Sequence, residues 1–136
     1  MELYDNERLE KAREFFRRDR YATENGAVIE AVGKNYAKIR LEITERHKNA
    51  VGSVMGGVYF TIADFAFAVA TNVDEPNVVS LTSDISFIGV PKTGTLYAET
   101  ELIKDSRTVC TFNVRVTDSA GNMIAAVKTV GYKLKK

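Results

Sequence analysis

The chain has 136 residues and a formal net charge of +1; 45% of its residues are hydrophobic and 27% are charged. This length predicts one domain over residues 1–136, with a core that needs no disulfide or metal. One cysteine and one histidine exclude a disulfide framework, a zinc finger and any site that needs two histidines. The balanced charge does not favour nucleic-acid binding, and the charged start predicts a cytoplasmic protein. The longest apolar run is too short to span a bilayer and has Asp64 in its middle.

The first predicted element is an amphipathic helix over residues 6–18, capped by Asn6. Residues 1–24 thus form an N-terminal helix and a turn. After a turn at Asn25-Gly26, the hydrophobic period changes to two. This period predicts two strands joined near Gly33.

The next predicted element is a long helix over residues 58–70, in which all but two of thirteen positions are apolar. A helix that is apolar on every side is a buried helix. Four strand-like runs follow, at residues 78–87, 96–104, 108–117 and 123–134. The expected fold is α+β: an antiparallel sheet of about six strands wrapped around one central helix, with the N-terminal helix beside it.

Asp64 is the only charged residue in the middle of this apolar helix. An unpaired carboxylate there is costly, and burial raises its pKa. It therefore either borders a functional cleft or bonds a neighbouring hydroxyl or backbone amide. Both interpretations stay open at this stage.

Gly56 and Gly57 stand where the helix begins. Bare backbone amides at a helix N-terminus suit an anionic oxygen, including a developing oxyanion; the alternative is a tight turn that only glycine can make. Eight residues separate Gly56 from Asp64, about 12 Å along a helix axis. One substrate carbonyl therefore cannot contact Gly56 and Asp64 of the same chain. If both residues act on one carbonyl, the site spans a two-fold dimer interface.

The loop before the helix adds further candidates. Asn49 either orients a water or a substrate carbonyl, or bonds its own loop. His47 stands between Arg46 and Lys48, which predicts an exposed side chain. Cys110 lies in an alternating strand, which predicts a buried, unreactive thiol. The sequence contains no metal-ligand cluster and no phosphate-binding glycine loop.

The run from His47 to Asn72 resembles hotdog-fold acyl-CoA thioesterases of the phenylacetic acid degradation type. That branch shows H-x-N-x-x-G-x-x-H-G-G followed by a helix with L-A-D. The residues that match are His47, Asn49, Gly52, Gly56, Gly57, Ala63 and Asp64. Met55 stands where the family often has histidine. The resemblance extends over residues 27–134.

The resemblance implies a role for each matching position. Asp64 would be the general base or nucleophile, the Gly56 amide would polarise the thioester carbonyl, and Asn49 would position water or substrate. Thr82 would hold the water near the acid. The residues implied to contact substrate are Gly57, Met55 and Ser83. Asn49 and Gly56 would come from one subunit, and Asp64 and Thr82 from its partner.

The expected function is hydrolysis of an acyl-CoA thioester without metal or other cofactor. The expected assembly is a homodimer that pairs into a dimer of dimers. The alternative is a non-catalytic acyl-CoA-binding module that acts as a ligand sensor. A turnover assay separates the two, because both keep the binding cavity.

Overall fold

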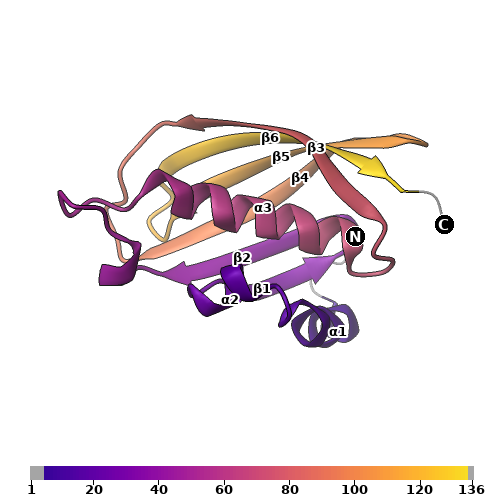
Figure 1. Ribbon diagram of the computed structural model, residues 1–136, viewed down its shortest axis with the longest axis horizontal. Helices are drawn as coiled ribbons and strands as arrows, with labels where there is room; N and C mark the ends of the chain where they lie inside the picture. The colour runs from indigo at the N-terminus through magenta and orange to yellow at the C-terminus, as the bar shows by residue number, and fades with distance from the viewer. Residues whose placement is uncertain (1–4, 135–136) are drawn as a thin grey trace.

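The computed structural model describes residues 5–134, in which one long helix lies across a curved antiparallel sheet (Figure 1). The elements in chain order are α1 (Asn6–Phe16), α2 (Arg20–Glu24), β1 (Val28–Gly33), β2 (Tyr36–Glu42), the 3₁₀ turn η1 (Glu45–His47), α3 (Gly56–Asn72), β3 (Val78–Phe87), β4 (Thr95–Asp105), β5 (Val109–Asp118) and β6 (Met123–Lys133). The predicted strands and the long helix are confirmed.

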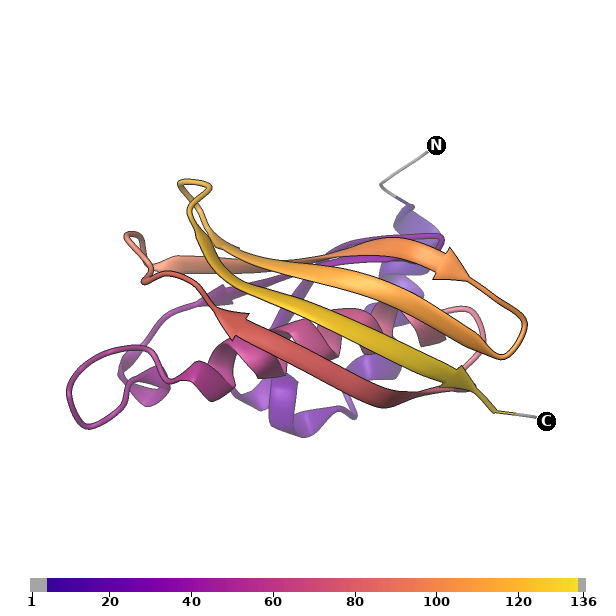
Figure 2. The same cartoon turned by 90° about the horizontal axis from the view of Figure 1, so that it is seen from above.

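The six strands run in the order β1-β2-β4-β5-β6-β3, and each pairs antiparallel with its neighbours. Because β3 comes directly after α3 but pairs with β6, it forms an outer edge of the sheet (Figure 2). This is the hotdog fold that the sequence predicts.

The core lies between α3 and the concave face of the sheet. Side chains on a strand alternate between the two faces, so every second residue points at the helix. Ile39 and Leu41 on β2 and Phe112 on β5 are buried in this way, and the Phe112 ring meets the Phe67 ring of α3 edge to face, 5.4 Å between centroids. The alternation explains why a period of two was readable in the sequence.

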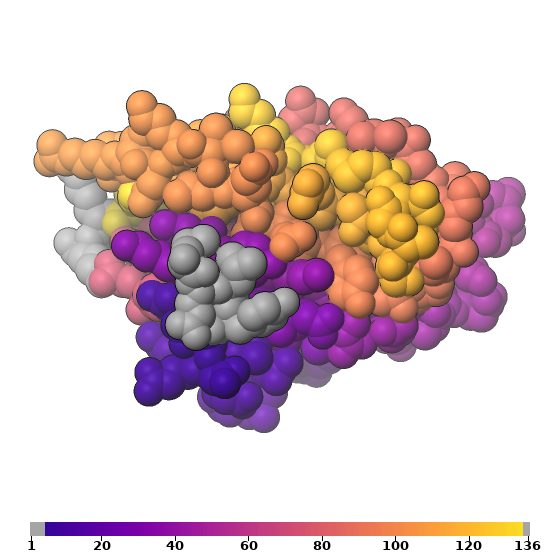
Figure 3. All heavy atoms as spheres, turned by 180° about the vertical axis from the view of Figure 1, so that it is seen from behind, coloured from indigo at the N-terminus to yellow at the C-terminus, as the bar shows by residue number. Residues whose placement is uncertain are grey.

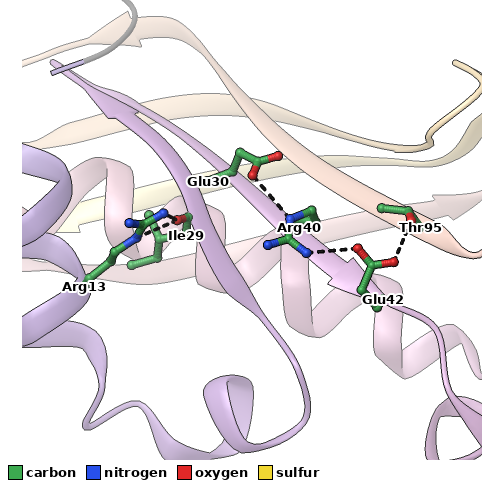
Figure 4. Close-up of polar contacts among 6 residues, drawn as sticks. All are labelled: Arg13, Ile29, Glu30, Arg40, Glu42 and Thr95. Atoms are coloured by element: carbon green, nitrogen blue, oxygen red, sulfur yellow. Dashed lines mark hydrogen bonds and ion pairs between the residues drawn. The ribbon is translucent and has the colours of Figure 1, made fainter. Parts of the chain in front are cut away.

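The opposite face of the sheet is polar. On β2, Arg40 donates hydrogen bonds to Glu30 of β1 and to Glu42, whose carboxylate also accepts from the Thr95 hydroxyl (Figure 4). Such a network of half-exposed charges is typical of a surface that faces water. We therefore look for the functional site on the other face of the sheet, where α3 lies.

Two helices precede the sheet in the chain: α1 packs along β1, and α2 contacts α3. Asp5, not Asn6, is the N-cap of α1: its carboxylate accepts from the Arg8 amide. Arg13 of α1 donates two hydrogen bonds to the Ile29 carbonyl oxygen, at 3.1 and 2.9 Å (Figure 4). The sequence analysis predicted only a turn where α2 lies, because five residues are too few to show a helical period.

Candidate active site

One face of α3 is not covered by the described chain, which corrects the prediction of a helix buried on all sides. Gly57, Phe60 and Asp64 are exposed, and Thr61 and Ala68 are half-buried. These positions follow each other at intervals of three and four residues, so they form one stripe along the helix. The stripe escaped the sequence analysis because most of its members are themselves apolar or small.

Asp64 lies on this stripe and faces a cleft between α3 and α2. The cleft has a volume of about 450 Å³, and its walls include Tyr21 and Ala22 of α2 and Phe60 and Phe65 of α3. Among residues 5–134, no hydrogen bond or ion pair holds the Asp64 carboxylate. Partial burial in the cleft, and secondly the charge of Asp19, raise the pKa of Asp64. The interpretation of Asp64 as a hydrogen-bonded structural residue is therefore not supported.

The start of α3 presents two unused donors. The helix begins at Gly56, as predicted, with Met55 in extended backbone as its N-cap. Val58 is the first amide of the helix with an acceptor, the Met55 carbonyl oxygen, and within residues 5–134 the amides of Gly56 and Gly57 have none. These two N–H groups lie at the positive end of the helix dipole, so they suit a negatively charged oxygen.

Both glycines have close neighbours. A Cβ added to Gly56 would lie 2.8 Å from Cε1 of Phe87, and one added to Gly57 would lie 2.9 Å from the terminal methyl of Met55. Phe87 and Met55 therefore crowd the donors, and both are themselves exposed to solvent. The two side chains therefore border the start of α3.

Asn49 bonds its own loop in the described chain. Its Oδ1 accepts from the amides of Val51 and Ser53, both at 3.1 Å. The side chain thus holds the loop in shape, as the structural interpretation predicted. Its Nδ2 group, on an exposed residue, has no acceptor within residues 5–134 and is available as a donor.

His47 is buried, with 4% of its surface exposed, so the prediction of an exposed histidine is wrong. Its Nδ1 accepts from the Thr44 amide at 2.9 Å, which places the proton of the neutral ring on Nε2, and Nε2 donates to the Asn25 carbonyl oxygen at 2.6 Å. The His47 carbonyl oxygen accepts from the Met55 amide. His47 thereby ties the end of α2 to the loop that leads into α3.

The hydroxyl candidates on β3 point to opposite faces of the sheet. Ser83 pairs with buried Thr129, and their hydroxyls are 3.0 Å apart. Thr129 alternates with Gly131, which touches Phe67 of α3, so Ser83 faces the helix. Thr82 is the neighbouring residue and therefore faces the other way. The fold does not bring Thr82 to the α3 side, and it does bring Ser83 there.

The remaining candidates add no second site. Cys110 is buried, as predicted, and burial raises the pKa of its thiol. No group of three or more His, Cys, Asp or Glu within residues 5–134 is arranged to hold a metal ion. None of the described helices is long and apolar enough to cross a bilayer.

The family of the chain follows from comparison with known proteins. Residues 51–125, more than half of the chain, match the model of the thioesterase superfamily. The chain belongs to this superfamily. The match covers all of α3 and the strands β3, β4 and β5, so it includes Gly56, Gly57 and Asp64 and leaves out Asn49 and the two N-terminal helices.

Individual relatives agree with the assignment to the thioesterase superfamily. A protein of Archaeoglobus fulgidus named "Putative esterase" is 28% identical over 104 residues, which are 76% of this chain and 68% of that protein. The structure of the Escherichia coli PaaI protein, from the phenylacetic acid degradation operon, matches with a TM-score of 0.85 at 20% identity over 96% of this chain and 95% of that one. A Streptococcus pneumoniae structure, described as a hypothetical thioesterase with coenzyme A, has a TM-score of 0.79 at 18% identity over 89% and 98%.

Proposed function

We propose that this thioesterase hydrolyses acyl-CoA thioesters, with Asp64 and the Gly56 amide as the reacting groups. The observation that carries the proposal lies along α3: two backbone amides at its start and a carboxylate two turns further on have no partner within the part of the chain that the structure describes. An amide donor and a base are the two functions that acyl transfer to water requires.

The chemistry follows from the two groups. The Gly56 amide, with Gly57 beside it, donates to the thioester carbonyl oxygen and stabilises the negative charge that develops as the carbonyl carbon becomes tetrahedral. Asp64 takes a proton from the attacking water, or attacks the carbonyl carbon itself to form an anhydride that water then opens. In either route the coenzyme A thiolate leaves and a carboxylic acid remains. Neither route uses a metal.

Two other residues complete the proposed site. Asn49 offers its free Nδ2 group to water or to the substrate. Ser83, not Thr82, is proposed as the β3 hydroxyl near the water, because it faces the helix side of the sheet. Met55 and Gly57 would contact the substrate beside the oxyanion donor.

We propose that the site is shared by two subunits. Gly56 and Asp64 lie about 12 Å apart along α3, too far for one carbonyl to touch both. The edge strand β3 exposes Val79 and Leu81, at 44% and 57%, beside backbone groups that no described strand pairs. Pairing of β3 with its copy covers this edge and sets two α3 helices antiparallel, so that Gly56 of one meets Asp64 of the other. Two such dimers would form the dimer of dimers expected above.

The choice of coenzyme A as the thiol rests on the Streptococcus pneumoniae relative, which was described with that molecule. A non-catalytic acyl-CoA sensor remains the second candidate, because Asn49 is engaged with its own loop and Met55 replaces a frequent histidine. A screen of short, medium, long and aryl acyl-CoAs tests the proposal. Hydrolysis of at least one, unchanged by a chelator, is expected; tight binding of a thioester without turnover supports the sensor.

The oxyanion donor can be tested with a matched pair of variants. Gly56→Pro removes the amide proton at the first helical position, where proline is well tolerated, and Met55 already has the extended backbone that precedes a proline. Gly56→Ala adds a similar Cβ but keeps the proton. We expect Gly56→Pro to lose about 10²–10³-fold in kcat relative to Gly56→Ala. Equal rates in the two variants would remove Gly56 from the mechanism.

The shared site can be tested by mixing subunits. Asp64→Asn and Gly56→Pro are each expected to be inactive alone. In an equal mixture with free exchange, half of the dimers are mixed, and each has one site with both changes and one with neither. About a quarter of wild-type activity should return. Exchange proven by mass spectrometry without returning activity would place the whole site in one chain.

A further inference from the structure

The cleft in front of Asp64 contains a second carboxylate that the proposed mechanism has not used. Asp19, the residue before α2, lines the same cleft as Asp64, which is on α3. Asp19 is not needed to cap α2, because its side chain makes no cap hydrogen bond there. Within the described chain no ion pair holds it either.

The surroundings of the two carboxylates make their repulsion effective. The cleft that both carboxylates line also contains the apolar side chains of Phe60, Phe65 and Ala68. Apolar surroundings lower the local dielectric constant and strengthen the effect of one charge on the other. Partial burial also raises the pKa of Asp19 itself. A second charged carboxylate in such a place raises the cost of ionising the first.

The basic groups nearby do not cancel this repulsion at Asp64. Arg20, on the α2 wall, is paired with Glu24, four residues along the same helix. Arg18 lies over the Phe15 ring, 4.8 Å from its centre, and its charge lowers the pKa of Asp19. It therefore helps to keep Asp19 charged. Among residues 5–134, the cleft wall also includes Tyr21, whose side chain adds no basic group.

We propose that Asp19, across the cleft from Asp64, makes Asp64 a stronger base than an isolated surface carboxylate. Asp19 is a positioning residue, because it touches no reacting atom. Its charge acts only through Asp64, by changing how readily Asp64 binds a proton. Its catalytic consequence rests on the proposed function, in which Asp64 takes a proton from water. A base of higher pKa accepts that proton more readily in the transition state.

A carboxyl-carbon NMR titration tests the coupling without reference to activity. The Asp64 signal, assigned by its loss in Asp64→Asn, is followed against pH in wild type, Asp19→Asn and Asp19→Glu. Asp19→Asn should move the Asp64 midpoint to lower pH, and Asp19→Glu, which keeps the charge, should leave it near wild type. Asp74→Asn is the matched control, because it removes one charge that pairs with Arg8 outside the cleft. A midpoint unchanged in Asp19→Asn overturns the proposal.

The pH dependence of kcat/KM then tests what the coupling does. We expect the acid limb to move to lower pH in Asp19→Asn, together with a lower plateau, because Asp64 becomes a weaker base. A purely structural loss would lower the rate at every pH and leave the limb in place. If the NMR midpoint moves and the acid limb does not, the coupling stands and Asp64 is not the reacting base, so the proposed function fails instead.

Discussion

The Phe87 ring lies directly against the backbone of Gly56, with Cε1 only 2.8 Å from the place where a Cβ would stand. The same ring is 60% exposed and lies 6.5 Å from the Tyr59 ring, centroid to centroid. Phe87 thus forms a wall at the proposed oxyanion donor. Its size sets how much room a thioester has at that point.

We predict that Gly56→Ala displaces the Phe87 ring and lowers kcat/KM by about 10-fold, since small shifts near reacting atoms are costly. Stability should hold or rise, because alanine favours a helix more than glycine. The double variant Gly56→Ala/Phe87→Ala should recover activity, because it restores the space. Steady-state kinetics of the single and double variants checks this, and a double variant no better than Gly56→Ala would contradict it. Gly56→Pro should not be rescued in the same way.

We predict that Asp64→Asn lowers turnover by about 10²–10⁴-fold while substrate binding survives. Because the pKa of Asp64 is raised in the folded state, ionisation opposes folding, and stability falls as pH rises above the ordinary carboxyl range. Asp64→Asn should therefore melt at the same or a higher temperature than wild type at pH 8, with the difference fading near pH 4. Thermal melts across this range provide the measurement; a variant that melts lower at pH 8 contradicts the expectation.

The buried histidine gives a stability prediction. His47→Ala leaves the Asn25 carbonyl and the Thr44 amide without partners, which costs about 1–3 kcal/mol in the free energy of unfolding. Activity should fall too, because His47 anchors the loop that carries Asn49. His47→Gln can still donate to Asn25 and should lie between alanine and wild type. Urea unfolding of the three proteins decides this, and an alanine variant as stable as wild type would show that the anchor is dispensable.

The hydrogen bonds of Asp118 lead to a prediction of how the stability of the fold changes in acid. Its carboxylate accepts from the amides of Lys92, Ala120 and Asn122 and from the Asn122 side chain, and these bonds lower its pKa to about 2. A lowered pKa stabilises the fold above the ordinary carboxyl value, and this contribution is lost as pH falls toward 2. Asp118→Asn should melt below wild type at pH 6, and the gap should narrow below pH 4. If the difference in melting temperature between Asp118→Asn and wild type stays constant with pH, the charge of Asp118 does not contribute to stability.

The sequence predicts most of the fold because one face of β2 and of β5 is buried, and that burial produces the period of two in these strands. The glycine pair separately marks the start of α3 at Gly56. The sequence places Gly56, Gly57 and Asp64 on one helix, and the structure has all three on α3; their roles stay a prediction. What the sequence could not give was side-chain direction on β3: a bulge between Ser80 and Thr82 shifts the register, and a shift of one residue changes the face.

The errors have a common physical cause, which is contact between distant segments. His47 has charged neighbours in sequence and is nevertheless buried, because η1 turns its ring toward Asn25, 22 residues earlier in the chain. The cleft at Asp64 depends on α2, whose five residues carry no period. Neither arrangement is a local property of the sequence.

The Arg13–Ile29 contact has a consequence for assembly. Helix α1 packs along β1, and the view from behind shows the indigo N-terminal residues against the purple segment that follows them (Figure 3). The Arg13 guanidinium occupies the Ile29 carbonyl oxygen, which a further strand would need. A bulge between Ile29 and Ala31 distorts the same strand. In the proposed dimer, in which the β3 strands of two copies pair, both free edges of the combined sheet would be β1 strands blocked in this way. Growth by strand addition would then stop at two copies, and the exposed Val79 and Leu81 of β3 would not lead to an open-ended polymer.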